Sequence, residues 1–288
     1  MRTLAFVHGR GQQARDPDVL RRRWAAALNK GLTAGGRNAL DTTAIEAIRF
    51  PYYADVLWAE VVQGRAAVPD VATLDAVQRV DPGLPDPVNR RQVAVLESMA
   101  RELGKEPSTA AEALIAVPDS TLVRGLLEWV ANHSGVDEAV IRGFLRDVSA
   151  YLDLPGCREA VQGVVRPALL ADAGSVLVGH SLGGVVSGEL LAEDQVRERV
   201  ALFVAVGAPL GLDAVTDGMR PRGSARPASP WVNVYDLRDW VALGSPLPRT
   251  GGLREQLAVA NPRSYEHSIE SYLAHPEVAA VIADALDG

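Results

Sequence analysis

The chain has 288 residues, which is enough for one large α/β domain or two smaller ones. Hydrophobic residues make up 48% of it and charged residues 23%, a globular balance that excludes a disordered chain. The formal net charge of −7 provides no basic field to attract phosphate backbones or anionic lipid, so we expect no nucleic-acid partner.

Cysteine content and hydropathy limit the compartment. The single cysteine, Cys157, excludes an intrachain disulfide framework and a cysteine-rich metal site. The apolar N-terminal stretch ends at His8 and is too short for a signal peptide, and no run approaches the roughly 18 apolar residues of a membrane span. We expect a cytoplasmic protein without stable membrane insertion.

Short apolar runs predict a sheet. Four runs have the continuous hydrophobicity of strands buried on both faces, namely Leu4–Val7, Ser175–Val178, Ala201–Val206 and Trp231–Tyr235. Ile45–Phe50 is a fifth candidate, ended by the proline that follows it. Helical segments separate or follow these runs, which predicts an α/β fold with an open, mostly parallel sheet whose ligands bind at the carboxyl ends of the strands.

Start and stop signals place the first helix and two loops. Asp16 is the expected N-cap with Pro17 at the first helical position, and the helix should end near Gly31. Proline, glycine, serine and arginine concentrate in residues 216–230 and 244–252, which predicts loops there.

The strand signal is absent from residues 64–156. Ser120–Ala131 and Asp137–Leu152 have helical periodicity, and a helix near 159–170 is expected to flank the sheet. We therefore predict one α/β domain over residues 1–288, with 64–156 inserted as a helical cap or lid over the active end of the sheet.

The pentapeptide Gly179–Gly183 matches the G-x-S-x-G motif of a nucleophile elbow. An apolar strand leads into it and the helix-compatible stretch 184–193 follows it, which is the context that the motif needs. The nucleophile of such a turn has strained backbone geometry, so the residues two before and two after it, Gly179 and Gly183, must be nearly free of side chain. Ser181 is therefore the candidate nucleophile.

Backbone N–H groups near Ser181 are candidates for an oxyanion hole. Leu182 begins the following helix, so its N–H is one expected donor. The turn His8–Gly11 follows the first strand, and its glycines let the backbone approach a substrate closely. We expect the second donor to be the N–H of Arg10.

Several blocks together resemble the α/β-hydrolase superfamily, particularly bacterial lipase-like and esterase-like members. The resemblance implies an α/β-hydrolase fold that lacks the first two strands, with a triad in the order serine, acid, histidine. The matching blocks are Phe6–Gly9, Gly179–Gly184, Gly207–Gly211, Asn233–Val241 and Glu266–Ser268.

The triad order selects the base among five histidines. His8 and His180 lie in motifs where backbone geometry is the requirement, and His133 lies in the insertion. Only His267 and His275 follow the candidate acids. His267 is favoured because it fits a loop beyond the last strand, whereas His275 lies at a helix end.

Two carboxylates after the strand that ends at Tyr235 compete for the acid. The resemblance favours Asp239, the second aspartate of Asp-x-x-Asp-x-Val, over Asp236. A loop four residues beyond the strand also reaches an imidazole better than the strand end does. Asp236 would then shape the loop.

These residues predict acyl transfer from a small-molecule ester. Ser181 attacks the carbonyl, His267 takes its proton, and Asp239 orients the imidazole, with no metal or organic cofactor required. Hydrolysis of a carboxylic ester, whether of a lipid, a small ester or a thioester, is the preferred function. Transfer to an acceptor other than water is the alternative, and a catalytically silent binding module is a third possibility, against which the intact triad argues. The acyl group, the leaving group and the oligomeric state stay open.

Overall fold

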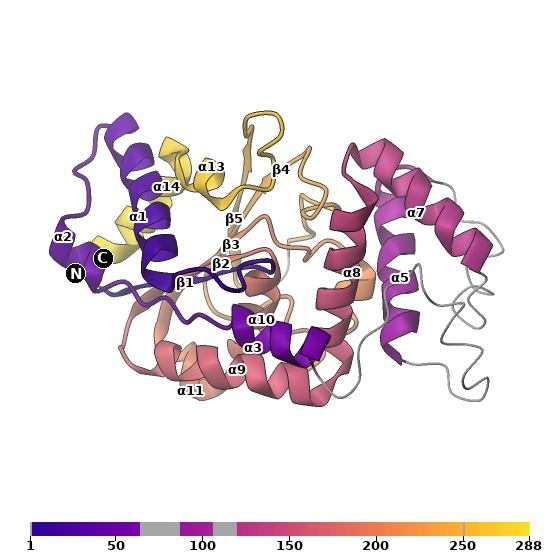
Figure 1. Ribbon diagram of the computed structural model, residues 1–288. Coiled ribbons are helices and arrows are strands. Elements are labelled where there is room, and N and C mark those ends of the chain that lie inside the picture. The colour runs from indigo at the N-terminus through magenta and orange to yellow at the C-terminus, as the bar shows by residue number, and fades with distance from the viewer. Residues whose placement is uncertain (1, 64–86, 106–119, 250) are drawn as a thin grey trace. The chain divides into compact units, whose positions relative to one another are not determined.

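The computed structural model describes residues 2–63, 87–105, 120–249 and 251–288 (Figure 1). They form two compact units. Of the described residues, the first contains those up to Asp55 and those within Gln162–Gly211 and Met219–Gly288, and the second contains those within Val56–Val161 and Leu212–Gly218.

A sheet of five parallel strands forms the centre of the first unit, with the spatial order β1-β2-β3-β4-β5 among the described residues. Four of the five runs expected to be strands are confirmed as β1 to β4. The strands are β1 (Leu4–Val7), β2 (Ser175–His180), β3 (Val200–Val206), β4 (Trp231–Asp236) and β5 (Leu253–Val259). The fold is therefore α/β with an open, all-parallel sheet, as the alternation of apolar runs and helices predicts.

Helices cover both faces of this sheet, which explains why its central strands are apolar throughout. Alternate residues of β1 to β4, such as Phe6, Val178, Val204 and Val234, pack in one core cluster with side chains of α1, α13 and α14. Figure 1 shows these three helices on one side of the sheet and α10 on the other. The helices concerned are α1 (Pro17–Ala34), α10 (Leu182–Leu190), α13 (Ile269–Leu273) and α14 (Pro276–Asp287). A further short helix, α11 (Asp194–Arg197), precedes β3.

Helix α1 begins as predicted and ends later. The Asp16 carboxylate caps it by accepting hydrogen bonds from the N–H groups of Asp18 and Val19. The helix continues past Gly31 to Ala34. A Cβ at Gly31 would lie 2.6 Å from the carbonyl oxygen of Leu273, so this glycine permits close helix packing and does not end the helix.

The prediction of a strand at Ile45–Phe50 is wrong. Residues Thr42–Glu46 form the short helix α2, capped by the Asp41 carboxylate, because Asp-Thr-Thr is a better helix start than a strand. Arg49 alone pairs with the sheet, through hydrogen bonds of 2.8 and 2.9 Å with the backbone of β1. The proline at position 51 has no N–H with which to extend this ladder.

Strand β5 is absent from the sequence expectations. It lies at the edge of the sheet, and its charged residues Arg254 and Glu255 are exposed. Such a strand lacks the continuous apolar run by which the central strands are recognised, and charged side chains on an edge discourage pairing with other chains. The predicted loops are confirmed except at Thr216, which is the last residue of a short helix: residues 217–230 and the described part of 244–252 are irregular.

The second unit is helical where it is described. The helices predicted at 120–131 and 137–152 are confirmed as α7 and α8, and the helix near 159–170 is confirmed as part of α9, which runs on into the first unit. Residues 64–86 and 106–119 of the predicted insertion lie outside the described residues, and its role as a cap stays a prediction. The elements are α3 (Ala54–Trp58), η1 (Ala59–Gln63), α5 (Pro87–Glu102), α7 (Ser120–Ser134), α8 (Glu138–Asp153), α9 (Pro155–Leu170) and α12 (Asp213–Thr216).

Side chains of α5 hold this helical unit together. Arg91 donates hydrogen bonds to both carboxylate oxygens of Asp153 and to the carbonyl oxygen of Ala214. No helix in the described part of the chain is long and apolar enough to cross a membrane.

Candidate active site

Ser181 occupies a sharp turn between strand β2 and helix α10. Its backbone angles are φ 55° and ψ −128°, a positive φ that non-glycine residues rarely adopt. The turn closes only because two neighbours lack side chains: a Cβ at Gly179 would lie 2.8 Å from the carbonyl oxygen of Gly183, and a Cβ at Gly183 would lie 2.2 Å from that of Val7. Strain of this kind is typical of functional positions.

Three side chains meet at this turn from three separate strand ends. The Ser181 hydroxyl lies 3.0 Å from Nε2 of His267, and Nδ1 of His267 lies 2.9 Å from Oδ2 of Asp239. The carboxylate accepts, so Nδ1 carries the proton and Nε2 is left to accept from the Ser181 hydroxyl. The side chain of His267 is 24% exposed, whereas that of Asp239 is fully buried. The structure therefore brings the three predicted residues together in the expected order of contacts.

The Asp239 carboxylate is held on both oxygens. Oδ1 accepts a hydrogen bond of 2.9 Å from the N–H of Val241. Oδ2 accepts one of 2.7 Å from the hydroxyl of Tyr272, in addition to the contact with His267. A buried carboxylate with three donors keeps a single orientation, which fixes the imidazole that it binds.

Asp236 ties two loops together. Its carboxylate accepts hydrogen bonds from the Arg238 guanidinium at 3.0 Å, the Arg238 N–H at 2.8 Å and the Asn261 N–H at 2.6 Å. Asn261 in turn donates to the carbonyl oxygen of Glu266, next to the base, and its Oδ1 lies 3.0 Å from Nε2 of His275. Asp236 and His275, the rejected candidates, thus lie in a network that holds the loop after β5.

The hydrogen bonds of Asp236 predict that its carboxylate stabilises the folded protein. Burial alone would raise the pKa of Asp236, but the hydrogen bonds from Arg238 and Asn261 outweigh it and lower the pKa. Asp236→Asn should lower the melting temperature at pH 7 by roughly 3 to 8 °C. The difference should shrink as the pH falls below about 4, because the stabilising charge is lost as the pH falls through the lowered pKa of the folded state.

Thermal unfolding of both proteins from pH 3 to 7 measures this effect. Asp194→Asn is the matched control, since Asp194 forms an exposed ion pair with Arg197 and should change the melting temperature little. A melting-temperature difference for Asp236→Asn that does not depend on pH would contradict the charge-based explanation.

His180 has a contact that the sequence analysis missed. Its Nε2 donates to the carbonyl oxygen of His267 at 3.1 Å, and the two ring centroids lie 4.7 Å apart. Burial, then the neighbouring His267, hold the pKa of His180 well below its ordinary value, so it stays a neutral donor. The signal available in the sequence was its position directly before the nucleophile.

His8 orders the turn expected to carry the second oxyanion donor. Its Nδ1 donates to the carbonyl oxygen of Gly9 at 2.7 Å, its Nε2 accepts from the N–H of Tyr53 at 3.1 Å, and its ring stacks on that of Tyr53. Burial lowers the pKa of His8 to about 4, which keeps the imidazole neutral at neutral pH, and the two hydrogen bonds fix its tautomer. The histidine is thus part of the folded turn, as expected of a residue needed for backbone geometry.

The backbone of this turn lies close to Ser181. A Cβ at Gly9 would lie 2.7 Å from Cβ of Ser181 and 3.2 Å from its hydroxyl oxygen. Leu182 is the first residue of α10, so its N–H has no acceptor within the helix. The donor roles of Arg10, which follows Gly9, and of Leu182 stay predictions.

Gly207 lies directly beside the contact between Asp239 and His267. It follows β3 with a φ of +53°, and a Cβ there would lie 2.8 Å from Oδ2 of Asp239 and 3.4 Å from Nδ1 of His267. Gly207→Ala should therefore push these two groups apart and lower kcat about 10²-fold, the effect of a misplacement of about 1 Å.

Gly223→Ala is the control for this substitution. Gly223 also has a positive φ, +90°, but among the described residues nothing lies within 4 Å of the place that its Cβ would take. Both variants carry the backbone strain, and only Gly207→Ala adds the collision. Equal kcat values for the two would show that Gly207 has no role in the site.

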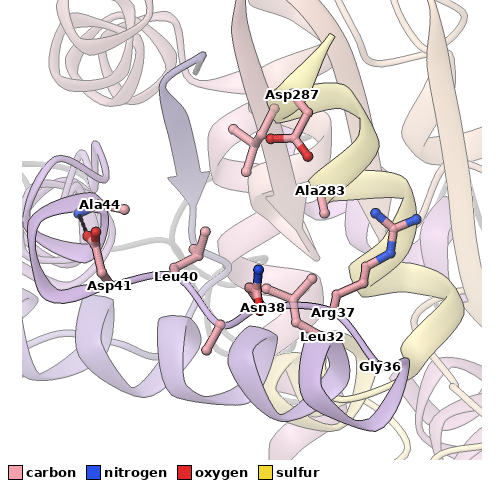
Figure 2. A pocket seen from close by; sticks show the side chains of 11 residues that line it. Leu32, Gly36, Arg37, Asn38, Leu40, Asp41, Ala44, Ala283 and Asp287 are labelled. Atoms are coloured by element: carbon pink, nitrogen blue, oxygen red, sulfur yellow. Dashed lines mark hydrogen bonds between the residues drawn. The ribbon is translucent and has the colours of Figure 1, made fainter.

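A separate cavity of about 470 Å³ lies between the C-terminal ends of α1 and α14 and the segment that leads to α2 (Figure 2). Leu32, Leu40 and Ala283 line it, and Arg37 at its edge forms an ion pair with Asp284. The lining residues contain no hydroxyl, thiol or imidazole, and of the two carboxylates that line it, that of Asp41 caps helix α2.

The fold and the site define an α/β protein whose parallel strand ends bring a strained serine, a histidine and a buried aspartate into contact. Among the described residues no cluster of histidine, cysteine, aspartate and glutamate could hold a metal ion. Comparison with protein-family models, with curated proteins and with solved structures gives no match.

Proposed function

We propose that this protein is a serine hydrolase with an α/β-hydrolase fold that lacks the first two strands, and that it cleaves a carboxylic ester. The observation that carries the proposal is the pair of contacts at His267, 3.0 Å to the Ser181 hydroxyl and 2.9 Å to the Asp239 carboxylate. A serine beside an imidazole that is itself oriented by a carboxylate is the arrangement of an activated nucleophile.

In the acylation step, Ser181, His267 and Asp239 each have one role. The Ser181 oxygen attacks the ester carbonyl while Nε2 of His267 takes the hydroxyl proton, and Asp239 stabilises the imidazolium. We assign the binding of the oxyanion to the N–H groups of Leu182 and Arg10, assisted by the positive end of the α10 dipole. Collapse of the tetrahedral intermediate breaks the bond to the leaving alcohol, which receives the proton from His267.

Deacylation repeats these steps with water. His267 removes a proton from water, the hydroxide adds to the acyl carbonyl, and the Ser181 oxygen leaves with the proton returned by His267. The products are a carboxylic acid and the free enzyme. The residues of the site therefore suffice for the reaction without a cofactor.

Hydrolysis of p-nitrophenyl esters with acyl chains of increasing length tests the proposal. We expect release of p-nitrophenol with a burst equal to the enzyme concentration wherever deacylation is slower than acylation. The chain length that gives the highest kcat/KM identifies the acyl group that the site accepts. Rates that do not exceed those of the Ser181→Ala variant for any ester would contradict the proposal.

A further inference from the structure

Tyr272 lies five residues after His267 in the chain and binds the same carboxylate oxygen of Asp239. It belongs to helix α13, it is buried, and its hydroxyl lies 2.7 Å from Oδ2 of Asp239, the oxygen that also accepts from Nδ1 of His267. One oxygen therefore joins the tyrosine to the base.

The direction of this hydrogen bond is fixed by a second partner. The N–H of Asp236 donates to the Tyr272 oxygen at 2.9 Å, so the tyrosine's own proton goes to Asp239. Burial, then Asp239, raise the pKa of Tyr272 above its ordinary value. The hydroxyl is therefore protonated, and a donor, at neutral pH.

We propose that Tyr272 is a positioning residue of the hydrolase, acting through Asp239. It holds Oδ2 where Nδ1 of His267 reaches it, and it limits how strongly the carboxylate stabilises the imidazolium. This inference rests on the proposed function.

Two physical effects follow from the shared oxygen. A carboxylate without the tyrosine donor can rotate, so the imidazole is held less firmly and kcat falls. Such a carboxylate is also a stronger partner for the imidazolium, so the base loses its proton at a higher pH. Asp239 and His180 both contact His267 directly, and His180 stays neutral.

A double-mutant cycle separates this role from a purely structural one. In the wild-type background Tyr272→Phe should lower kcat roughly tenfold with little change in KM, since a hydrogen bond to a charged group is lost. In the Asp239→Asn background the same change should alter kcat by less than about twofold, because the group through which Tyr272 acts is gone. Tyr265→Phe, an exposed tyrosine two residues before the base, is the control and should leave kcat unchanged.

The acid limb of the pH–rate profile gives a second readout, which a structural role would not move. Tyr272→Phe should shift this limb to higher pH. Incorporation of 3-fluorotyrosine at position 272 keeps the hydroxyl but makes it a stronger donor, so it should shift the limb to lower pH. This second variant decides the question if the phenylalanine variant does not fold.

The outcomes are distinct. The same loss of kcat in both backgrounds, or an acid limb that neither variant moves, overturns the role of Tyr272 while an active wild-type protein leaves the hydrolase proposal standing. A wild-type protein that hydrolyses no ester overturns the proposed function, and this inference with it.

Discussion

Ser181→Ala should lower kcat by about 10⁶-fold, the loss expected when the nucleophile of a triad is removed. The alanine keeps the positive φ of this turn and its Cβ, so the fold should be retained and only the hydroxyl that contacts His267 is lost. The measurement is kcat on the best p-nitrophenyl ester, together with the melting temperature.

Ser187→Ala is the matched control for this variant. Ser187 lies on the same helix, α10, is also buried, and in the described structure its hydroxyl has no hydrogen-bond partner. Its loss should leave kcat within about twofold of wild type, as for a position without a special interaction. Turnover by Ser181→Ala equal to that of Ser187→Ala would remove Ser181 from the mechanism.

Asp239→Asn should lower kcat by about 10⁴-fold, as amide replacement of a triad acid does in serine proteases. The amide cannot stabilise the imidazolium, and its NH₂ group turned toward Nδ1 of His267 would fix the wrong tautomer. Val241 and Tyr272 donate to different oxygens of the carboxylate, whereas the amide has only one oxygen to accept these hydrogen bonds. The melting temperature should therefore be measured alongside kcat.

Asp236→Asn is the comparison for the acid. Asp236 contacts Arg238 and Asn261 and supports the loop that carries the base, so its loss should lower stability more than activity. At a temperature where both variants are folded, its kcat should lie within about tenfold of wild type, because neither the base nor its acid is altered chemically. A large loss of kcat in Asp236→Asn together with a nearly normal kcat in Asp239→Asn would show that Asp236 is the acid.

The central strands and the nucleophile turn could be predicted because their signals are local. Continuous apolar runs identify strands buried on both faces, and the G-x-S-x-G spacing reflects space that only glycine leaves, as Gly179 and Gly183 show. Strand β5 could not be recognised in this way, since an exposed edge strand is not apolar throughout. The prediction of a strand at Ile45–Phe50 was wrong because the Asp41 cap favours a helix over Thr42–Glu46, despite the apolar residues that follow the cap.

The supporting residues of the site could not be predicted because their contacts are non-local. Tyr272 reaches Asp239 across 33 positions, and His180 reaches the backbone of His267 across 87. Neither residue belongs to a motif of fixed spacing that includes its partner. The same holds for Gly207. A side chain at this position would collide with Asp239 and contact His267, and this can be seen only when the folded structure places those residues beside it.

Reaction with a fluorophosphonate probe, followed by mass spectrometry of the digested protein, tests the nucleophile most directly. We expect a single phosphonylated site at Ser181, with labelling at least about 10²-fold slower in His267→Ala, because the base activates the attacking hydroxyl. No labelling of the wild-type protein, or labelling at another residue that persists in Ser181→Ala, would contradict the assignment of Ser181 as the nucleophile.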